Sequence, residues 1–326
     1  MTNSGKNTRQ WDQIWQSGKA NCFSDYDGSP NAQLIRDEWS RFFARLDDGQ
    51  RLLDLCTGNG AVLVVALECA RAAGNRISAC GIDSASIAPS SEVADAGPGD
   101  TWFIRAAVEA LPFADASFDA VTSQFGVDYI QPGAAAREAL RVLTDGGRGM
   151  FISHASGGIT VTQAEAELQD IDELQNEIAI FPAAQEAFPK VWAAERASRP
   201  LPQADLATAQ AAHDRFHQAL AKIGETFQQR AAFAVYRDTG DILQHAFLNR
   251  QHFPVETLLD KVREVEQSVL LHKARLEALV GAALDESRCR EYVEACRQHG
   301  AMACDYRPIG AANGDGQLAW AIDFSK

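Results

Sequence analysis

The chain has 326 residues, enough for about two domains. Hydrophobic residues make up 46% of it and charged residues 23%, a globular composition that excludes a largely disordered or fibrous protein. The formal net charge of −14 disfavours nucleic-acid binding, and the longest apolar run, 61–67, is too short to cross a bilayer. The first residues, MTNSGKNTRQWDQ, contain no apolar signal segment, so we expect a cytoplasmic protein. From the charge and the short apolar run we expect no nucleic-acid or membrane partner.

Helices and strands alternate over the first half of the chain. Residues 1–30 are polar with interspersed aromatic side chains, and 31–46 have apolar residues at helical spacing. Short apolar runs then alternate with helical segments, an order typical of a parallel sheet with right-handed crossovers. The expected strands are 51–55, 76–82, 102–106, 118–123 and 148–153, and the expected helices among them are 61–73, 84–96 and 132–143.

A long helical region separates the fifth strand from the end of the chain. Residues 160–300 are rich in Ala, Glu, Gln and Leu, and 255–280 carry an apolar stripe. This stripe is consistent with a bundle that buries its own apolar faces or with a homodimer formed through the helical insertion. Residues 304–324 alternate apolar and polar around Asn-Gly-Asp-Gly, which predicts a hairpin. We therefore expect an N-terminal lid segment at 1–30, a sheet domain at 31–159, a helical cap at 160–300 and a terminal hairpin at 301–326.

The strongest local signal is the sequence LLDLCTGNGAV. An apolar strand and an acid precede Gly58 and Gly60, which open a helix and let a ligand approach the backbone at the carboxyl edge of a parallel sheet. A dinucleotide site needs a third glycine where this chain has Leu63, so an NAD-dependent oxidoreductase is disfavoured. Asp54 would repel a pyrophosphate but can accept hydrogen bonds from an ammonium group. We therefore expect a phosphate-free nucleoside with a cationic amino-acid tail.

Asp83 supports the same ligand. It ends the second expected strand, where a carboxylate can accept hydrogen bonds from both ribose hydroxyls. The alternative role for Asp83 is to cap the helix expected from Ser84.

Four blocks resemble those of class I S-adenosylmethionine-dependent methyltransferases, in the small-molecule subgroup that includes ubiquinone and menaquinone methyltransferases. The blocks are LLDLCTGNGAV, GIDSAS, VEALPFADASFDAVTSQFG and ALRVLTDGGRGMFIS. The resemblance implies an α/β, Rossmann-like sheet of order 3-2-1-4-5-7-6 with strand 7 antiparallel and a helical insertion between strands 5 and 6. It also implies S-adenosylmethionine as cofactor and S-adenosylhomocysteine as product. Asp54, Gly58 and Gly60 would surround the methionine part, and Asp83 would bind the ribose.

Two positions depart from the family pattern. The first glycine of the family motif is Cys56 here, but Thr57, which follows it, can donate its hydroxyl to the ligand. The acid that usually binds the adenine amino group is Ala107, so adenine would be held by the backbone of Val108 with help from Glu109. The remaining residues expected to line the cofactor pocket are Gln124 and Phe125.

His154 is the candidate catalytic residue. It stands at the carboxyl end of the fifth expected strand, and imidazole suits proton acceptance near neutral pH. A hydroxyl acceptor needs such a base, whereas a carboxylate does not. The alternative is a strand-end residue that hydrogen-bonds to the insertion. The candidate acceptor-binding residues are Trp15, Tyr26, Asp128 and Tyr129.

The sequence therefore predicts an enzyme that transfers a methyl group to a small metabolite or natural product, most directly to a carboxylate or hydroxyl oxygen. No carboxylate cluster follows the fifth strand to hold a divalent cation, so we expect no metal. A peptide-directed methyltransferase, for example a carboxyl methyltransferase, with its acceptor bound by the helical region is the main alternative. A non-catalytic S-adenosylmethionine-binding scaffold is favoured only by Ala107.

Overall fold

The computed structural model describes residues 9–16, 28–89, 91–97, 99–228, 230 and 233–326. The chain divides into two compact units, a sheet unit formed by Met1–Thr162 with Ala278–Lys326 and a helical unit formed by Gln163–Glu277. Within the described ranges, no helix is both long enough and apolar enough to span a membrane.

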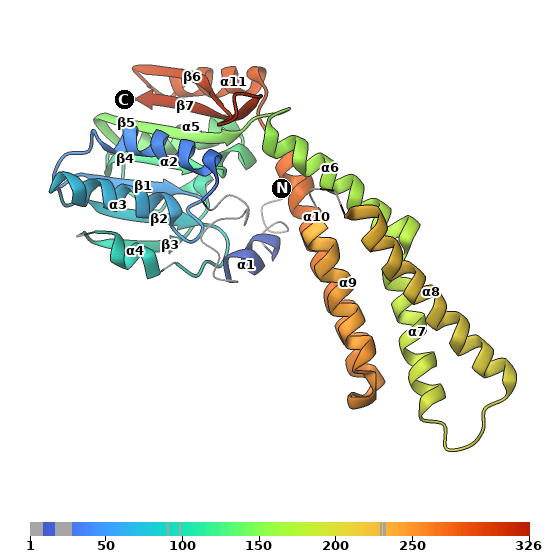
Figure 1. The fold of residues 1–326 in the computed structure, drawn as a ribbon. Coiled ribbons are helices and arrows are strands. Elements are labelled where there is room, and N and C mark those ends of the chain that lie inside the picture. The colour runs from blue at the N-terminus through green and yellow to red at the C-terminus, as the bar shows by residue number, and fades with distance from the viewer. Residues whose placement is uncertain (1–8, 17–27, 90, 98, 229, 231–232) are drawn as a thin grey trace. The chain divides into compact units, whose positions relative to one another are not determined.

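Seven strands form one sheet in the order β3-β2-β1-β4-β5-β7-β6. Figure 1 shows this order from β3 at the bottom to β6 at the top. The first five strands are parallel, whereas β7 runs antiparallel to both β5 and β6. The predicted fold class is confirmed. The strands are β1 (Arg51–Leu55), β2 (Ser78–Asp83), β3 (Thr101–Arg105), β4 (Phe118–Gln124), β5 (Leu143–His154), β6 (Ala303–Gly310) and β7 (Gln317–Ser325).

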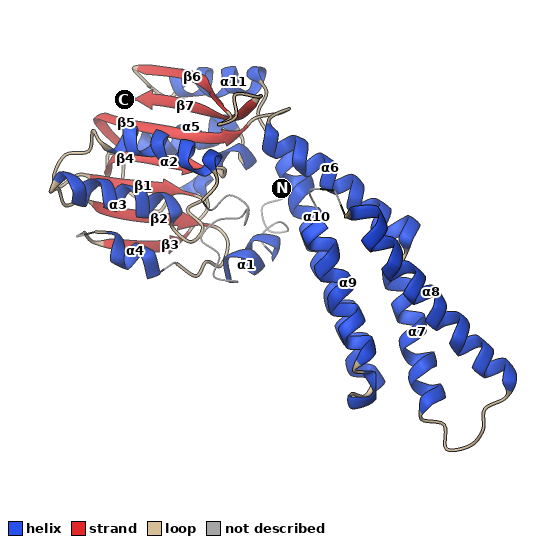
Figure 2. Ribbon diagram, in the orientation of Figure 1, coloured by secondary structure: helices blue, strands red, loops and turns tan. Residues whose placement is uncertain are grey.

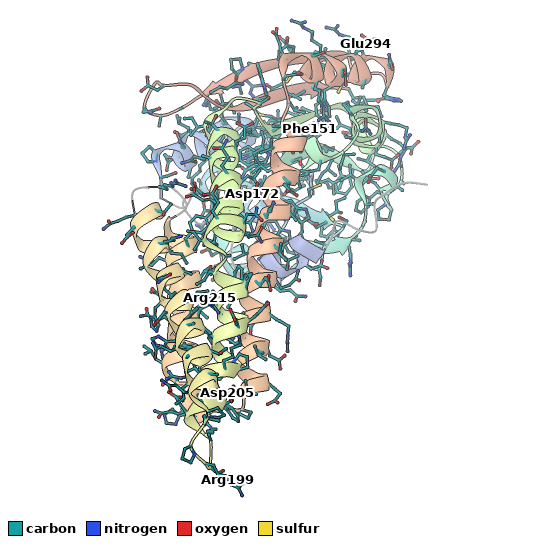
Figure 3. All side chains as sticks on the ribbon, turned by 90° about the vertical axis from the view of Figure 1, so that its right-hand side faces the viewer. Phe151, Asp172, Arg199, Asp205, Arg215 and Glu294 are labelled. Carbon is teal, nitrogen blue, oxygen red and sulfur yellow. The ribbon has the colours of Figure 1, made fainter. Side chains whose placement is uncertain are left out.

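Helices cover both faces of the sheet. One apolar core lies between the sheet and three helices that include Trp39, and the other lies between the sheet and two helices that include Tyr292. In Figure 3, Phe151 lies within the sheet and Glu294 lies on the outer surface of the last helix. The helices of the first face are α2 (Pro30–Phe43), α3 (Ala61–Ala73) and α4 (Ser91–Ala96); those of the second are α5 (Pro132–Val142) and α11 (Glu286–Gln298). An additional helix, α1 (Arg9–Gln16), precedes them, and the 3-10 turns η3 (Val108–Ala110) and η4 (Val127–Tyr129) follow β3 and β4.

The helical unit contains helices and loops only, as Figure 2 shows for its described residues. The apolar stripe predicted at 255–280 lies on α10, and none of its residues is more than 7% exposed. These residues are Leu258, Val262, Val265, Val269, Leu276 and Leu279. The chain therefore buries this stripe itself, while charged residues such as Asp205 and Arg215 lie on the outside (Figure 3). Its elements are most of α6 (Ile159–Glu173), η5 (Leu174–Ile178), α7 (Ile180–Glu195), α8 (Gln203–Phe227), α9 (Phe233–Leu248), η6 (Arg250–His252) and most of α10 (Val255–Ala282).

Two expected segments differ from the structure. The helix expected at 84–96 begins only at Ser91, because the backbone N–H groups of Ala85, Ser86 and Ala88 donate to side-chain oxygens instead of to a helical turn. The helical cap expected at 160–300 is shorter, because α11 buries its apolar face against the sheet and belongs to the sheet unit.

A glycine in β5 allows close packing with β7. Gly149 pairs with Phe324, and a Cβ atom at Gly149 would overlap the Phe324 ring. We expect Gly149→Ala to lower the free energy of unfolding by about 1–3 kcal/mol through overpacking. Gly133→Ala is the matched control, because open space surrounds that helical glycine and alanine favours a helix. Denaturant unfolding measures both, and equal stabilities would contradict this packing.

Candidate functional site

The loop between β1 and α3 has a backbone that favours glycine. Gly58 and Gly60 have φ values of 52° and 94°, in the left-handed region, and Cys56 also has a positive φ of 54°. The Thr57 N–H donates to the Ile82 carbonyl at 2.8 Å, which fixes the loop to the end of β2. The predicted motif residues therefore form a tight turn, which we call the glycine turn (Cys56 to Gly60), at the carboxyl edge of the sheet.

Asp54 is a buried acid below the glycine turn. Its side chain is 1% exposed, and Oδ1 accepts a hydrogen bond of 2.8 Å from the Thr122 hydroxyl. Burial raises the pKa of Asp54 to about 7 and repulsion from Asp83 adds to the shift, whereas hydrogen bonds from the Thr57 and Thr122 side chains oppose it. Asp54 is thus suited to bind a cation, which would favour its charged form.

Asp83 connects the glycine turn to the loop after β2. Its Oδ2 accepts from the Gly58 N–H at 3.0 Å, and its Oδ1 accepts from the Ala85 N–H at 2.8 Å. Burial raises the pKa of Asp83, and these backbone hydrogen bonds oppose the shift. No helix begins at Ser84, so Asp83 does not act as the helix cap considered above.

Helix α1 packs on the glycine turn. The Trp15 ring lies so close to Gly58 that a Cβ atom there would be 2.5 Å from the indole. The Asn59 side chain donates to the Trp15 carbonyl at 2.9 Å and accepts from the Ala88 N–H at 2.9 Å. Asp12 accepts from the Ser86 N–H at 2.6 Å. Trp15, predicted as an acceptor residue, therefore contacts the glycine turn, whereas Tyr26 lies outside the described residues.

Asp128 and His154 form a buried pair at the ends of two neighbouring strands. The Nδ1 atom of His154 lies 2.6 Å from Oδ2 of Asp128, and the His154 N–H donates to the same oxygen at 3.1 Å. The side chains are 1% and 0% exposed. Because β5 ends at His154 and η4 follows β4, the topology brings the pair together at the carboxyl edge. An aspartate in this position holds the imidazole in one orientation and tautomer.

Aromatic side chains surround this pair. Phe125 stacks on His154 with ring centroids 4.4 Å apart, and Tyr129 meets His154 edge-on at 6.2 Å. Trp11 of α1 meets Tyr129 edge-on at 5.4 Å. The turn after β4 also packs on the glycine turn, because Gly126 leaves no room for a side chain beside Cys56. Helix α1 therefore contacts both the glycine turn and the aromatic group next to His154.

The other predicted pocket residues have mixed positions. Val108 is buried in η3, whereas the Glu109 side chain is exposed. Gln124 accepts a hydrogen bond of 2.6 Å from the Trp39 indole, so this side chain is held by α2. The sequence prediction did not single out Asn59, although an asparagine between two glycines is a signal that could have found it.

Comparison with known proteins gives the family of this domain. Residues 53–151 match the family model described as "Methyltransferase domain". The sheet around this region has the strand order that the resemblance implies. Residues 53–151 belong to a methyltransferase domain. The predicted family is thereby confirmed for this domain.

The methyltransferase domain is similar to curated quinone-biosynthesis enzymes. Over 121 residues it is 36% identical to the ubiquinone/menaquinone biosynthesis C-methyltransferase UbiE of Paracoccus denitrificans, covering 36% of this chain and 47% of that enzyme. The UbiE enzyme of Geotalea uraniireducens is 32% identical over 135 residues, covering 39% and 56%. The chain thus spans about half the length of these curated relatives. A solved S-adenosylmethionine-dependent methyltransferase from Mesorhizobium loti has 21% identity and a TM-score of 0.31 over 43% of this chain and 58% of that one.

Proposed function

We propose that this chain is an S-adenosylmethionine-dependent methyltransferase that transfers a methyl group to a hydroxyl oxygen of a small molecule. The observation that carries this proposal is the buried Asp128–His154 pair, at the same edge of the sheet as the glycine turn. The methyltransferase domain supports the cofactor class, and the pair supports an acceptor that must lose a proton.

The residues of the glycine turn fit the cofactor. Asp54 is a buried carboxyl group, which suits the ammonium group of the methionine part. Asp83 would bind the ribose, and the backbone of Val108 would hold the adenine. The left-handed backbone at Gly58 and Gly60 lets the ligand approach the main chain closely. When bound, S-adenosylmethionine supplies a methyl group on a positively charged sulfur. The leaving group, S-adenosylhomocysteine, needs no proton.

His154 would accept the proton of the acceptor hydroxyl. Asp128 contacts Nδ1, so the acceptor proton would pass to the other ring nitrogen, Nε2. The Asp128 carboxylate would also stabilise the imidazolium that forms. As the oxygen–methyl bond forms and the sulfur–methyl bond breaks, the hydroxyl proton passes to His154. A carboxylate acceptor would not need this pair, so the pair favours a hydroxyl.

The relatives suggest a second acceptor atom. Both UbiE enzymes are named C-methyltransferases. A ring carbon next to a hydroxyl becomes nucleophilic when that hydroxyl loses its proton, so the same base would serve carbon methylation. This proposal includes no metal, because His154 would supply the base.

The proposed activity can be tested with methyl-labelled S-adenosylmethionine and a library of hydroxylated metabolites. We expect one class of hydroxyl compounds to gain the label and the mass of one methylene group, measured by mass spectrometry. Fragmentation of the product would locate the methyl group on oxygen or carbon. If only carboxylic acids or peptides gained the label, the hydroxyl proposal would be wrong.

Asp54 should make cofactor binding depend on pH. Its carboxylate form binds the ammonium group, and its pKa is raised to about 7 by burial, so lowering the pH through this value protonates the free site. We expect the affinity for S-adenosylhomocysteine to fall by up to about tenfold for each pH unit below this pKa. Calorimetry across this range measures the effect. Asp54→Asn should bind weakly with little pH dependence, whereas Asp100→Asn, at an exposed position before β3, should behave as the wild type.

A further inference from the structure

The chain that follows the helical unit contacts the backbone of His154. The Leu284 N–H donates to the His154 carbonyl at 2.8 Å, and the Leu284 carbonyl accepts from the Ser156 N–H at 2.8 Å. The Trp320 indole on β7 donates to the same Leu284 carbonyl at 3.0 Å. Leu284 therefore acts as a one-residue extension of the sheet beside the end of β5, with Ala155 as its bridge partner.

The same segment also holds the turn that carries Asp128. The Tyr292 hydroxyl on α11 donates to the Val127 carbonyl at 2.6 Å and lies 3.2 Å from the Ile130 carbonyl, so it bonds the turn on both sides of Asp128. Tyr292 is fully buried, and its ring meets Phe151 edge-on with centroids 6.4 Å apart. Burial raises the pKa of Tyr292 well above its usual range, with Asp128 adding to the shift, so the phenol stays protonated and can donate.

We propose that Leu284 and Tyr292 are positioning residues that set the contact between Asp128 and His154. This inference rests on the proposed role of His154 as the base. Each member of the pair is held by its own anchor, His154 through the Leu284 backbone and Asp128 through the Tyr292 hydroxyl. The anchors are eight residues apart on one rigid segment, because Asp285 caps α11 by accepting from the Arg288 N–H at 2.8 Å.

Tyr292→Phe tests the proposal, because it removes the hydroxyl and keeps the buried ring. The readout is the Nδ1 proton of His154 by NMR in the full chain, since a proton in a short bond to a carboxylate resonates far downfield. We expect this resonance to move upfield or broaden in Tyr292→Phe. The matched control is Tyr306→Phe, which removes a hydroxyl that donates to exposed Glu286, and its His154 resonance should match the wild type.

The kinetic readout is a change in kcat without a change in the KM for S-adenosylmethionine. We expect kcat to fall by about 10- to 100-fold in Tyr292→Phe and to stay unchanged in Tyr306→Phe. Trp320→Phe, which loses the donor to Leu284, should perturb the same resonance from the His154 side and serves if Tyr292→Phe does not fold. An unchanged resonance in the folded variants would overturn the positioning role. A perturbed resonance in a chain that methylates nothing would retain that role and refute the proposed function.

Discussion

Replacing His154 with alanine is expected to slow methyl transfer by about 10²–10⁴-fold, the range for loss of a positioned base. The affinity for S-adenosylhomocysteine should not change, because His154 pairs with Asp128 and not with the glycine turn. Single-turnover kinetics with labelled S-adenosylmethionine separates the chemical step from binding. His245→Ala is the control, since this histidine is exposed on α9. Full activity of His154→Ala would remove His154 from the mechanism.

Asp128→Asn tests whether the Asp128 carboxylate is needed to hold His154 in the tautomer that accepts a proton. The amide keeps the size of the side chain but can present an N–H to Nδ1, which would favour the wrong tautomer of His154. We therefore expect a loss close to that of His154→Ala, and the double variant should be little worse than either single one. Independent, multiplicative losses would show that the two residues do not act as a unit.

Asp83→Ala is expected to have the largest effect on cofactor binding. The variant loses the proposed bonds to the ribose and also the existing bonds from the Gly58 and Ala85 N–H groups, so the glycine turn becomes less ordered. A loss of about 1–3 kcal/mol is typical for hydrogen bonds to a charged group, which corresponds to about 5- to 150-fold in affinity.

Equilibrium dialysis with labelled S-adenosylmethionine measures this loss. Asp100→Ala serves as the control, because Asp100 is exposed and lies at the amino end of β3, whereas Asp83 lies at the carboxyl end of β2. Wild-type affinity in Asp83→Ala would contradict the ribose assignment, whereas equal losses in both variants would indicate a general effect of charge.

Much of the sheet could be predicted from the sequence. Apolar runs such as 51–55 mark strands that are buried on both faces, and the resemblance provided their order. The start of β5 was placed too late, because Asp-Gly-Gly at 145–147 is typical of a turn. In the structure, Gly146 and Gly147 pair with the backbone of Lys326, 179 residues beyond Gly147, which local sequence cannot indicate.

The contacts of the candidate site were harder to predict than its residues. Asp128 and His154 were both singled out, but their pairing depends on how η4 turns after β4, which a local pattern does not encode. The same holds for Trp15, whose position on Gly58 depends on the hydrogen bond from Asn59. Cofactor motifs are local and could be recognised, whereas the acceptor side is assembled from segments far apart in the chain.

We propose that the glycine turn and Asp83 bind a sulfonium nucleoside without phosphate. Isothermal titration calorimetry of the wild-type chain with S-adenosylhomocysteine and, separately, with NAD measures this binding. We expect saturable binding of S-adenosylhomocysteine and no heat of binding with NAD. If NAD bound saturably and S-adenosylhomocysteine did not, the assignment of the glycine turn and Asp83 to a phosphate-free ligand would be wrong.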